Sequence, residues 1–265
     1  MLQSAILNVM VQAARKAARS LKRDFGEVER LQVSVKGPGN FVSAADHRAE
    51  DILREELAKA RPGYGFLGEE GGRREGSDKT HTWIVDPLDG TTNFLHGIPQ
   101  FAISIALERD RSIVAGLVYN PATDDLYTAE RGKGAFHNDR RMRVAARRHL
   151  GDTVVACGLP HLGRGDLAQF RKEFAKIQEQ VGGLRRFGAA AIDLAWVAEG
   201  RFDAFWERNL SAWDMAAGLL LVREAGGYVT DLDGGDAMLD KGHIIAGNEA
   251  IHGALLKLLK EAGRE

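Results

Sequence analysis

The chain has 265 residues, of which 44% are hydrophobic, and its 36 basic and 37 acidic residues leave a formal net charge of -1. This length is enough to bury a large core, as one domain or as two half-domains, and the balanced charge argues against a broad nucleic-acid-binding surface. No apolar stretch approaches the roughly 20 residues of a membrane-spanning helix. The single cysteine, Cys157, excludes an intramolecular disulfide and a cysteine-based metal site. We therefore expect a soluble protein of the cytoplasm, with no membrane partner.

The amino-terminal half is predicted to be an α+β unit rich in antiparallel strands. Apolar residues recur at three- and four-residue spacing between Ile6 and Leu21, which predicts an amphipathic helix rather than an export signal. A second helix is predicted over residues 46–61, because Pro62 and Gly63 end its pattern. Strands are predicted near residues 33–35, 66–67, 83–85, 101–107, 112–119, 126–129 and 134–144, the last interrupted by a turn at 138–139.

The carboxy-terminal half alternates strands and helices from residue 152 onwards. Alternation of this kind is typical of α/β architecture. The change of pattern predicts a boundary near Leu150, with residues 1–150 carrying the antiparallel sheet and the metal-binding motifs and residues 151–265 completing the metal and substrate site. The predicted strands are 153–156, 184–187, 202–206, 228–231 and 243–246, and the predicted helices are 167–181, 189–198, 212–225 and 250–259.

The most informative segment places two aspartates directly after a predicted strand. Asp86 and Asp89 follow the apolar run 83–85. Pro87 lies between them, lacks a backbone N–H and stiffens the turn, so the carbonyl of Leu88 can point to the same place as the two side chains. Carboxylate and carbonyl oxygens are ligands that Mg²⁺ prefers. The alternative is that the two aspartates only cap a turn, which is a common role beside proline and glycine.

Other features around this turn favour a metal site over a simple cap. The segment from Gly90 to Thr92 stands where a helix is predicted to start, and backbone N–H groups at such a position favour phosphate. Glu69-Glu70 and Asp214 stand at the ends of other apolar runs. Like charges that are buried together are stabilised when divalent cations neutralise them. The pattern therefore indicates metal-assisted phosphoryl transfer.

Three acidic motifs occur in a fixed order along the chain and resemble the signatures of the inositol monophosphatase family. They are Gly68-Glu69-Glu70, Asp86-Pro87-Leu88-Asp89-Gly90-Thr91 and Trp213-Asp214-Met215-Ala216-Ala217-Gly218. The resemblance extends from about Lys36 to Gly227, and the segment from Asn93 to Pro99 is similar to bacterial members of the extragenic-suppressor type. It implies an α/β fold, a layered α/β/α/β/α sandwich of the sugar-phosphatase type. It also implies a homodimeric, lithium-sensitive, Mg²⁺-dependent phosphatase of inositol 1-phosphate or a similar polyol phosphate.

The resemblance also implies roles for individual residues. Asp46 and Thr91 would orient the attacking water, and Glu70 would stand beside these catalytic groups. Where some relatives carry asparagine near a helix start, this chain carries Asp193, whose effect on substrate choice is left open. The residues implied to hold two or three Mg²⁺ ions are Glu69, Asp86, Leu88 through its carbonyl, Asp89 and Asp214. The residues implied to bind substrate are Lys36, Gly90, Thr91, Thr92, Arg185, Gly188, Ala189, Ala190, Glu207 and Asp214.

Three alternative functions compete with this one. A haloacid-dehalogenase-like phosphatase requires aspartates two residues apart near the amino terminus, whereas Asp86 and Asp89 are three apart. The same fold could act on fructose 1,6-bisphosphate, a nucleotide 3′-phosphate or histidinol phosphate, although Glu207 favours a monophosphorylated polyol because a carboxylate accepts hydrogen bonds from vicinal hydroxyls. A regulatory protein could bind transcription or ribosome-assembly machinery through the arginines of residues 140–148. A solvated surface is the simpler interpretation of that run, and the retained metal ligands weigh against a purely regulatory role.

Overall fold

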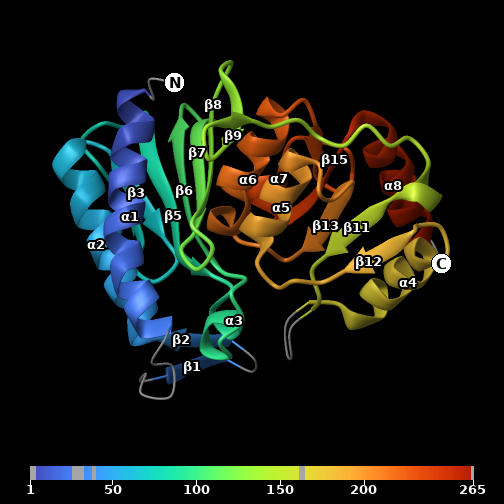
Figure 1. Ribbon diagram of the computed structural model, residues 1–265, viewed down its shortest axis with the longest axis horizontal. Helices are drawn as coiled ribbons and strands as arrows, with labels where there is room; N and C mark the ends of the chain where they lie inside the picture. Colours follow the sequence, from blue (N-terminus) through green and yellow to red (C-terminus); the bar gives the residue numbers. More distant parts are fainter. Residues whose placement is uncertain (1–3, 26–32, 38–39, 161–164, 264–265) are drawn as a thin grey trace.

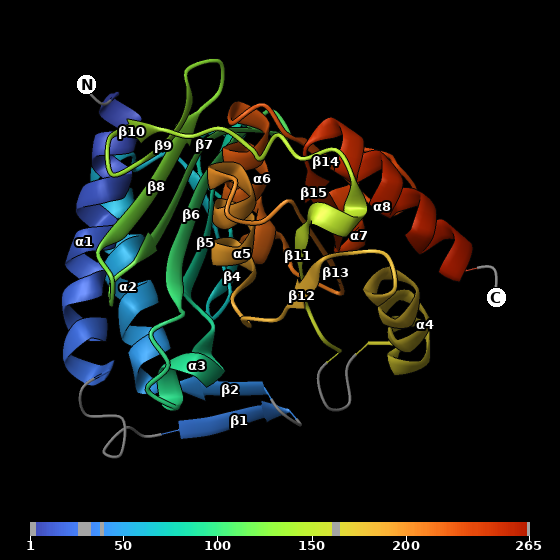
Figure 2. The same cartoon turned by 45° about the vertical axis from the view of Figure 1, so that its right-hand side comes forward.

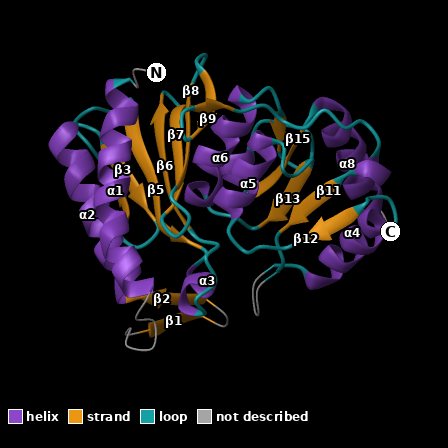
Figure 3. Ribbon diagram, in the orientation of Figure 1, coloured by secondary structure: helices purple, strands orange, loops and turns teal. Residues whose placement is uncertain are grey.

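The computed structural model describes residues 4–25, 33–37, 40–160 and 165–263, and it consists of five layers that alternate between helices and sheets (Figure 1, Figure 3). Two helices cover the outer face of an eight-stranded sheet, two more lie between this sheet and a five-stranded sheet, and another two cover the far face of the second sheet. The expected layered sandwich is confirmed. The three helical layers are α1 (Ala5–Phe25) with α2 (Ala44–Ala60), α5 (Ala190–Glu199) with α6 (Ala212–Glu224), and α4 (Leu167–Gln178) with α8 (Glu249–Ala262).

The eight-stranded sheet has the order β10-β9-β8-β7-β6-β5-β3-β4 and is antiparallel except between β3 and β5. Its outer face packs against α1, whose buried residues recur every three to four positions, at Leu7, Met10, Ala14, Ala17 and Leu21. The strands are β3 (Gly65–Gly68), β4 (Gly72–Arg74), β5 (His81–Asp89), β6 (Ala102–Arg109), β7 (Ser112–Asn120), β8 (Asp125–Glu130), β9 (Gly134–His137) and β10 (Arg140–Arg141).

The five-stranded sheet has the order β12-β11-β13-β15-β14, with β12, β11 and β13 parallel and the other two strands antiparallel to their neighbours. Its mixed pairing agrees with the alternating pattern of the second half. The change from one sheet to the other falls between Arg141 and Val154; a division into two halves near residue 150 stays a prediction. The strands are β11 (Val154–Cys157), β12 (Gly183–Arg185), β13 (Ala204–Arg208), β14 (Tyr228–Thr230) and β15 (His243–Gly247).

Smaller elements lie outside the five layers. The hairpin of β1 (Val33–Gly37) and β2 (Asn40–Ser43) lies next to the short helix α3 (Thr91–Leu95), at the lower edge of the molecule in Figure 2. A 3₁₀ turn, η2, covers Leu150–Asp152, and a short helix, α7, covers Met238–Lys241. The sequence pattern predicted neither of the last two, because neither is long enough for an apolar periodicity.

Helix α6 forms the centre of the molecule, because it contacts both sheets. Small residues allow this close packing. A Cβ on Gly116 of β7 would lie 2.9 Å from the carbonyl oxygen of Ala217, and a Cβ on Gly218 would lie 2.5 Å from Cβ of Leu194 in α5. Helix α6 is therefore held against the first sheet on one side and against α5 on another.

Most predicted elements are present with shifted ends. The helix predicted over 167–181 ends at Gln178, and the strand predicted over 134–144 is divided into β9 and β10 by the turn at Asn138 and Asp139, which both have positive φ. In the described parts of the chain no helix is both long and apolar enough to cross a membrane.

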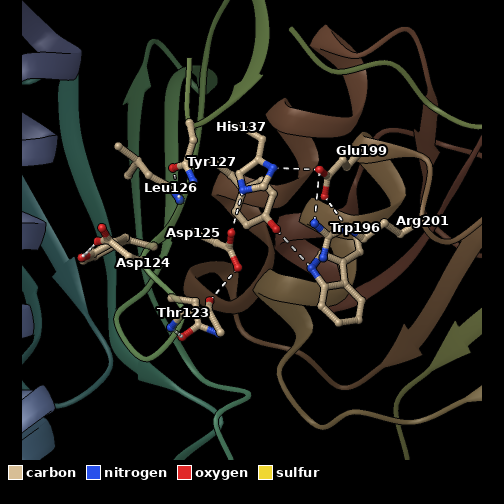
Figure 4. Close-up of polar contacts among 12 residues, drawn as sticks. Thr123, Asp124, Asp125, Leu126, Tyr127, His137, Trp196, Glu199 and Arg201 are labelled. Carbon is tan, nitrogen blue, oxygen red and sulfur yellow. Dashed lines mark hydrogen bonds and ion pairs between the residues drawn. The ribbon is translucent and has the colours of Figure 1, made fainter. Parts of the chain in front are cut away.

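A polar network ties the first sheet to α5 (Figure 4). His137 of β9 lies between two carboxylates, with Nε2 2.8 Å from Oδ1 of Asp125 and Nδ1 2.7 Å from Oε1 of Glu199. The ring of Tyr127 stacks on His137, and its hydroxyl accepts a hydrogen bond from the indole N–H of Trp196. The two ends of α5 therefore face different polar surroundings, since its other end lines the pocket described next.

Candidate active site

The turn that follows β5 carries Asp86 and Asp89. The pairing of β5 with β6 becomes irregular between these two residues, where Pro87 cannot donate a hydrogen bond to the ladder. The backbone N–H of Leu88 instead donates to Oδ1 of Asp86 over 2.9 Å. Asp86 is 1% exposed and Asp89 is also buried. The interrupted strand therefore holds two buried carboxylates close to each other.

The electrostatics of this pair indicate a need for cations. Burial raises the pKa of Asp86 well above its usual range, and Glu69, Asp89 and Asp214 raise it further. Burial and Asp214 likewise raise the pKa of Asp89. Within the described residues, no lysine or arginine forms an ion pair with Asp86 or Asp89. Buried carboxylates of this kind destabilise the folded protein unless they are paired or bind a metal.

Backbone N–H groups orient two of the carboxylates. Oδ2 of Asp89 accepts a hydrogen bond from the N–H of Ala191, in the first turn of α5, over 2.7 Å. Oδ2 of Asp214 accepts one from the N–H of Ser211 over 2.6 Å, as part of a capping box at the start of α6. Helix starts from the second half thus hold carboxylates of both halves in place.

Thr91 and Asp46 form a second pair. The hydroxyl oxygen of Thr91 lies 3.0 Å from Oδ1 of Asp46 and 3.1 Å from the carbonyl oxygen of Leu88. Asp46 is buried in the first turn of α2. Because a hydroxyl has one proton and two lone pairs, Thr91 can donate to one of these oxygens and still accept a hydrogen bond from a water.

Glu50 supports the strand end that carries Glu69, and the sequence analysis missed it. Its two carboxylate oxygens accept hydrogen bonds from the N–H groups of Glu70 and Gly71 over 2.8 and 2.7 Å. A Cβ on Gly68 would lie 2.4 Å from Oε2 of Glu50, so a larger residue there would displace this carboxylate. The available signal was helical spacing, because Glu50 follows Asp46 by one turn on the buried face of α2.

The carboxylates of Asp86, Asp89 and Asp214 line a pocket of about 490 Å³. Asp46 lies behind Thr91, and Glu70 lies next to His47 with 3.7 Å between Oε2 and Nδ1, so neither lines the pocket. Ala189 lies against Gly90 behind the lining, and the side chain of Lys36 is outside the described residues. The predicted residues that line the pocket are Glu69, Asp86, Leu88, Asp89, Gly90, Thr91, Thr92, Gly188, Ala190, Glu207 and Asp214.

The structure does not place Arg185 in this pocket, which corrects one expectation. Arg185 is exposed at the end of β12 and donates to the carbonyl of Leu184 over 2.8 Å. Arg186 lines the pocket instead, with its guanidinium so close to Gly188 that a Cβ there would lie 2.4 Å from Nη1. Successive side chains of an extended segment point in opposite directions, so a shift of one residue exchanges the two arginines.

A second group of carboxylates lies beside the first. The carboxylate of Glu207 lies against Gly158, where a Cβ would be 1.8 Å from Cδ. Burial raises the pKa of Glu207 well above its usual range, and the nearby charges of Asp193, Asp214 and Asp89 raise it further. Asp193 is 1% exposed and lines the same pocket.

The donor set fits a hard divalent cation. Carboxylate oxygens with a backbone carbonyl are the ligands that Mg²⁺ takes, and no cysteine or histidine lines the pocket among the described residues. In that part of the chain, no three acidic or histidine side chains already have ion-binding geometry. Since Asp89 and Asp214 each accept a backbone hydrogen bond, their carboxylates are oriented but would still adjust around an ion.

Comparisons with known proteins agree with this site. The model of the inositol monophosphatase family matches residues 2–264. The inositol-1-monophosphatase of Mesorhizobium japonicum is 67% identical over 261 residues, which cover 98% of each chain, and a Nus factor SuhB of Pseudomonas aeruginosa is 42% identical over 259 residues, which cover 96% of each. The crystal structure of the extragenic suppressor protein suhB from Bartonella henselae superposes with a TM-score of 0.94 at 61% identity, over 97% of this chain and 99% of that one. The chain therefore belongs to the inositol monophosphatase family, a family of phosphatases.

Proposed function

We propose that the protein is a Mg²⁺-dependent phosphomonoesterase that hydrolyses inositol 1-phosphate or a similar polyol phosphate. The observation that carries this proposal is the set of carboxylates from three elements that face one pocket, in which Asp86 and Asp89 have no cationic partner among the described residues. The relative from Mesorhizobium japonicum, named inositol-1-monophosphatase, supports the choice of substrate.

The residues that would hold two or three Mg²⁺ ions are Glu69, Asp86, the carbonyl of Leu88, Asp89 and Asp214. Bound Mg²⁺ supplies charge neutralisation for the phosphate and a water of lowered pKa. Thr91 would accept a hydrogen bond from the attacking water while it donates to Asp46, so the pair fixes the direction of attack. The phosphate would lie against residues 90–92, which line the pocket at the start of α3.

The alcohol part of the substrate would lie towards the second half of the chain. Gly188 and Ala190 leave room for a ring, and the carboxylate of Glu207 can accept hydrogen bonds from hydroxyls of that ring. Two arginines line the pocket, and since Arg208 is paired with Glu173, Arg186 is the one that could meet a second anionic group. A monophosphorylated polyol therefore fits this end better than a simple alkyl ester.

Phosphate release tests the proposal. Wild-type protein is assayed with inositol 1-phosphate, fructose 1,6-bisphosphate and a nucleotide 3′-phosphate, each with Mg²⁺ and with a chelator. Mg²⁺-dependent release that is greatest for the inositol ester supports the proposal. Greater release from another ester changes the substrate and keeps the mechanism, while no release from any ester contradicts the proposal.

A second candidate function follows from the name of one relative. The Pseudomonas aeruginosa protein that is 42% identical is named Nus factor SuhB, so we propose that this chain also binds a component of the transcription machinery. Of the arginines in residues 140–148, Arg140 and Arg141 are exposed on β10, whereas Arg147 is tied to Asp203 over 3.0 Å. Binding to purified transcription complexes that survives Asp86→Asn and is lost with Arg140→Glu plus Arg141→Glu would support it. Binding that is unchanged in the double variant would exclude this surface.

Two further properties are proposed from the resemblance to the family. We propose that the chain forms a homodimer and that Li⁺ inhibits phosphate release in the presence of Mg²⁺. Light scattering at micromolar concentration tests the first, since a monomeric mass contradicts it. Titration of Li⁺ at fixed Mg²⁺ tests the second, since turnover that is independent of Li⁺ contradicts it.

A further inference from the structure

We propose that Asp193 determines specificity by accepting a hydrogen bond from one hydroxyl of the substrate's alcohol part, while a second hydroxyl donates to Glu207. The pocket would then be built for a polyol with at least two donor hydroxyls near the ester. This inference rests on the proposed phosphatase function, and it concerns a residue that neither the metal site nor the water-orienting pair requires.

Asp193 is a buried acid with an unsatisfied oxygen in the wall of the pocket. It lies in the first turn of α5, is 1% exposed, and its Oδ1 has no hydrogen-bond donor among the described residues. A buried carboxylate oxygen without a donor is strongly destabilising. A group that enters the pocket can supply the donor that the fold does not.

Other acids with a buried, unsatisfied oxygen differ from Asp193, because each forms an ion pair. Glu173 pairs with Arg208, Glu199 pairs with Arg201, and Asp231 pairs with Lys241, at 2.6 to 2.8 Å. In the described part of the chain, Asp193 has no basic group within 4.0 Å, although the charge of Arg186 reaches it. A structural role would leave Asp193 paired like the others.

The surroundings of Asp193 favour a hydroxyl over an ammonium group. Glu207 and Asp193 repel each other, and Arg186 already supplies one positive charge to this end of the pocket. Gly188 lies under Arg186 and Gly158 lies under Glu207, so side-chain bulk is absent next to both charged groups. Neutral hydroxyls can then satisfy both carboxylates without displacing the arginine.

The experiment compares two esters that differ only in hydroxyls. Inositol 1-phosphate and cyclohexyl phosphate are assayed with Mg²⁺ against wild type, Asp193→Ala, Asp193→Leu and Asp193→Asn, after thermal unfolding has shown which variants fold. We expect the alanine and leucine variants to lose about tenfold to a hundredfold in kcat/KM for the inositol ester. Their kcat/KM for the cyclohexyl ester should change less than about twofold, and Asp193→Asn, which retains an acceptor oxygen, should stay near wild type.

The outcomes separate this inference from the proposed function. Equal losses on both esters would overturn the inference, because they indicate a structural role, and so would a wild type without preference for the hydroxylated ester. Loss in Asp193→Asn as large as in the alanine variant, together with preference for an amino-cyclitol phosphate, would assign an ammonium ligand instead. No turnover of any ester by wild type contradicts the proposed function itself. Glu199→Gln, at the other end of α5 and outside the pocket, is the matched control and should leave the ratio of the two kcat/KM values unchanged.

Discussion

Two clusters of acidic side chains lie near opposite ends of α5, and they differ in how their charges are balanced. In the pocket, Asp86 and Asp89 are buried, and their pKa values are raised by this burial and by the charges of nearby carboxylates such as Asp214. At the far end, Asp125 and Glu199 enclose His137, and every one of these side chains has a polar partner (Figure 4). The first cluster costs stability until a ligand arrives, whereas the second contributes stability by itself. Function is therefore concentrated where the fold leaves charge unbalanced.

The balanced cluster extends beyond the histidine. Arg201 lies 2.6 Å from Oε2 of Glu199, and its guanidinium lies 5.1 Å from the ring centroid of Trp196. The hydroxyl of Thr123 donates to Oδ2 of Asp125 over 2.6 Å. These local contacts add partners to a network in which His137 and the hydrogen bond between Trp196 and Tyr127 join β8, β9 and α5, and so hold the middle layer against the first sheet.

The largest effect is expected from removing one charge in the pocket. Asp86→Asn should reduce metal-dependent phosphate release roughly a thousandfold or more, because metal stabilisation of the transition state amounts to several kcal/mol and each 1.36 kcal/mol is tenfold. Without metal the same variant should unfold at a higher temperature than wild type, since a buried charge is gone. Steady-state assays and thermal scans measure the two changes.

Asp125→Asn is the matched control, because it makes the same chemical change in the balanced cluster. Its unfolding temperature should fall, since His137 loses the carboxylate oxygen that lies 2.8 Å from its Nε2, while phosphate release stays near wild type. If both variants behaved alike in the two assays, the contrast between the clusters would be wrong.

Metal removal should expose the same difference through pH. Folded Asp86 and Asp89 keep their protons to higher pH than in the unfolded chain, so above about pH 4 the metal-free protein should lose stability as pH rises towards their folded pKa values. Mg²⁺ should reverse this loss, by about 2.7 kcal/mol at a concentration one hundred times its Kd. Chemical denaturation at several pH values, with chelator and with Mg²⁺, measures how the free energy of unfolding depends on pH in each case. A free energy of unfolding that is independent of Mg²⁺ would contradict a metal site here.

A smaller effect is expected from His137→Gln. Glutamine cannot bridge both carboxylates, so the free energy of unfolding should fall by about 1.5 to 3 kcal/mol, the range for hydrogen bonds to charged groups. Because His137 lies outside the pocket, kcat/KM should change less than about twofold. Urea denaturation and the phosphate assay together test this, and a large loss of kcat with unchanged stability would show that the network acts on catalysis.

The smallest effect concerns the turn after β14. Burial opposes ionisation of Asp231, but hydrogen bonds from Lys241 and from the N–H groups of Gly235 and Asp233 outweigh it and lower its pKa to about 2. Lys241→Met should therefore lower the unfolding temperature slightly at pH 7, and the difference from wild type should shrink as pH falls from about 4 towards 2. Thermal scans at several pH values measure this, with no change in phosphate release expected. A difference that grew in acid would contradict the assigned pairing.

The fold and much of the site could be predicted because their signals are local. The apolar period of α1 and the position of Asp86 and Asp89 at the end of a strand depend only on neighbouring residues. The start of α6 was likewise visible from the chain around Asp214. Local patterns of this kind set which groups stand at the ends of elements.

What the sequence could not specify depends on contacts between distant segments. Glu50 supports residues about twenty positions away, and Arg186 replaces Arg185 in the pocket because of the direction in which β12 ends. The carboxylate of Glu207 needs the empty space at Gly158, which directly follows a different strand, β11. The residues of such pairs are far apart in the sequence, and no regular spacing between them indicates that they are in contact.

The close packing of α6 limits which residues can be varied when new activities are selected from mutant libraries. Gly218 lies against Leu194, and Ala217 lies against Gly116, so a larger residue in either place would shift the helix that begins with Asp214. Arg186 and Asp193 line the pocket from another side and belong to other segments than that helix. A mutant library aimed at a new ester should therefore diversify Arg186 and Asp193 and keep residues 214–218 constant.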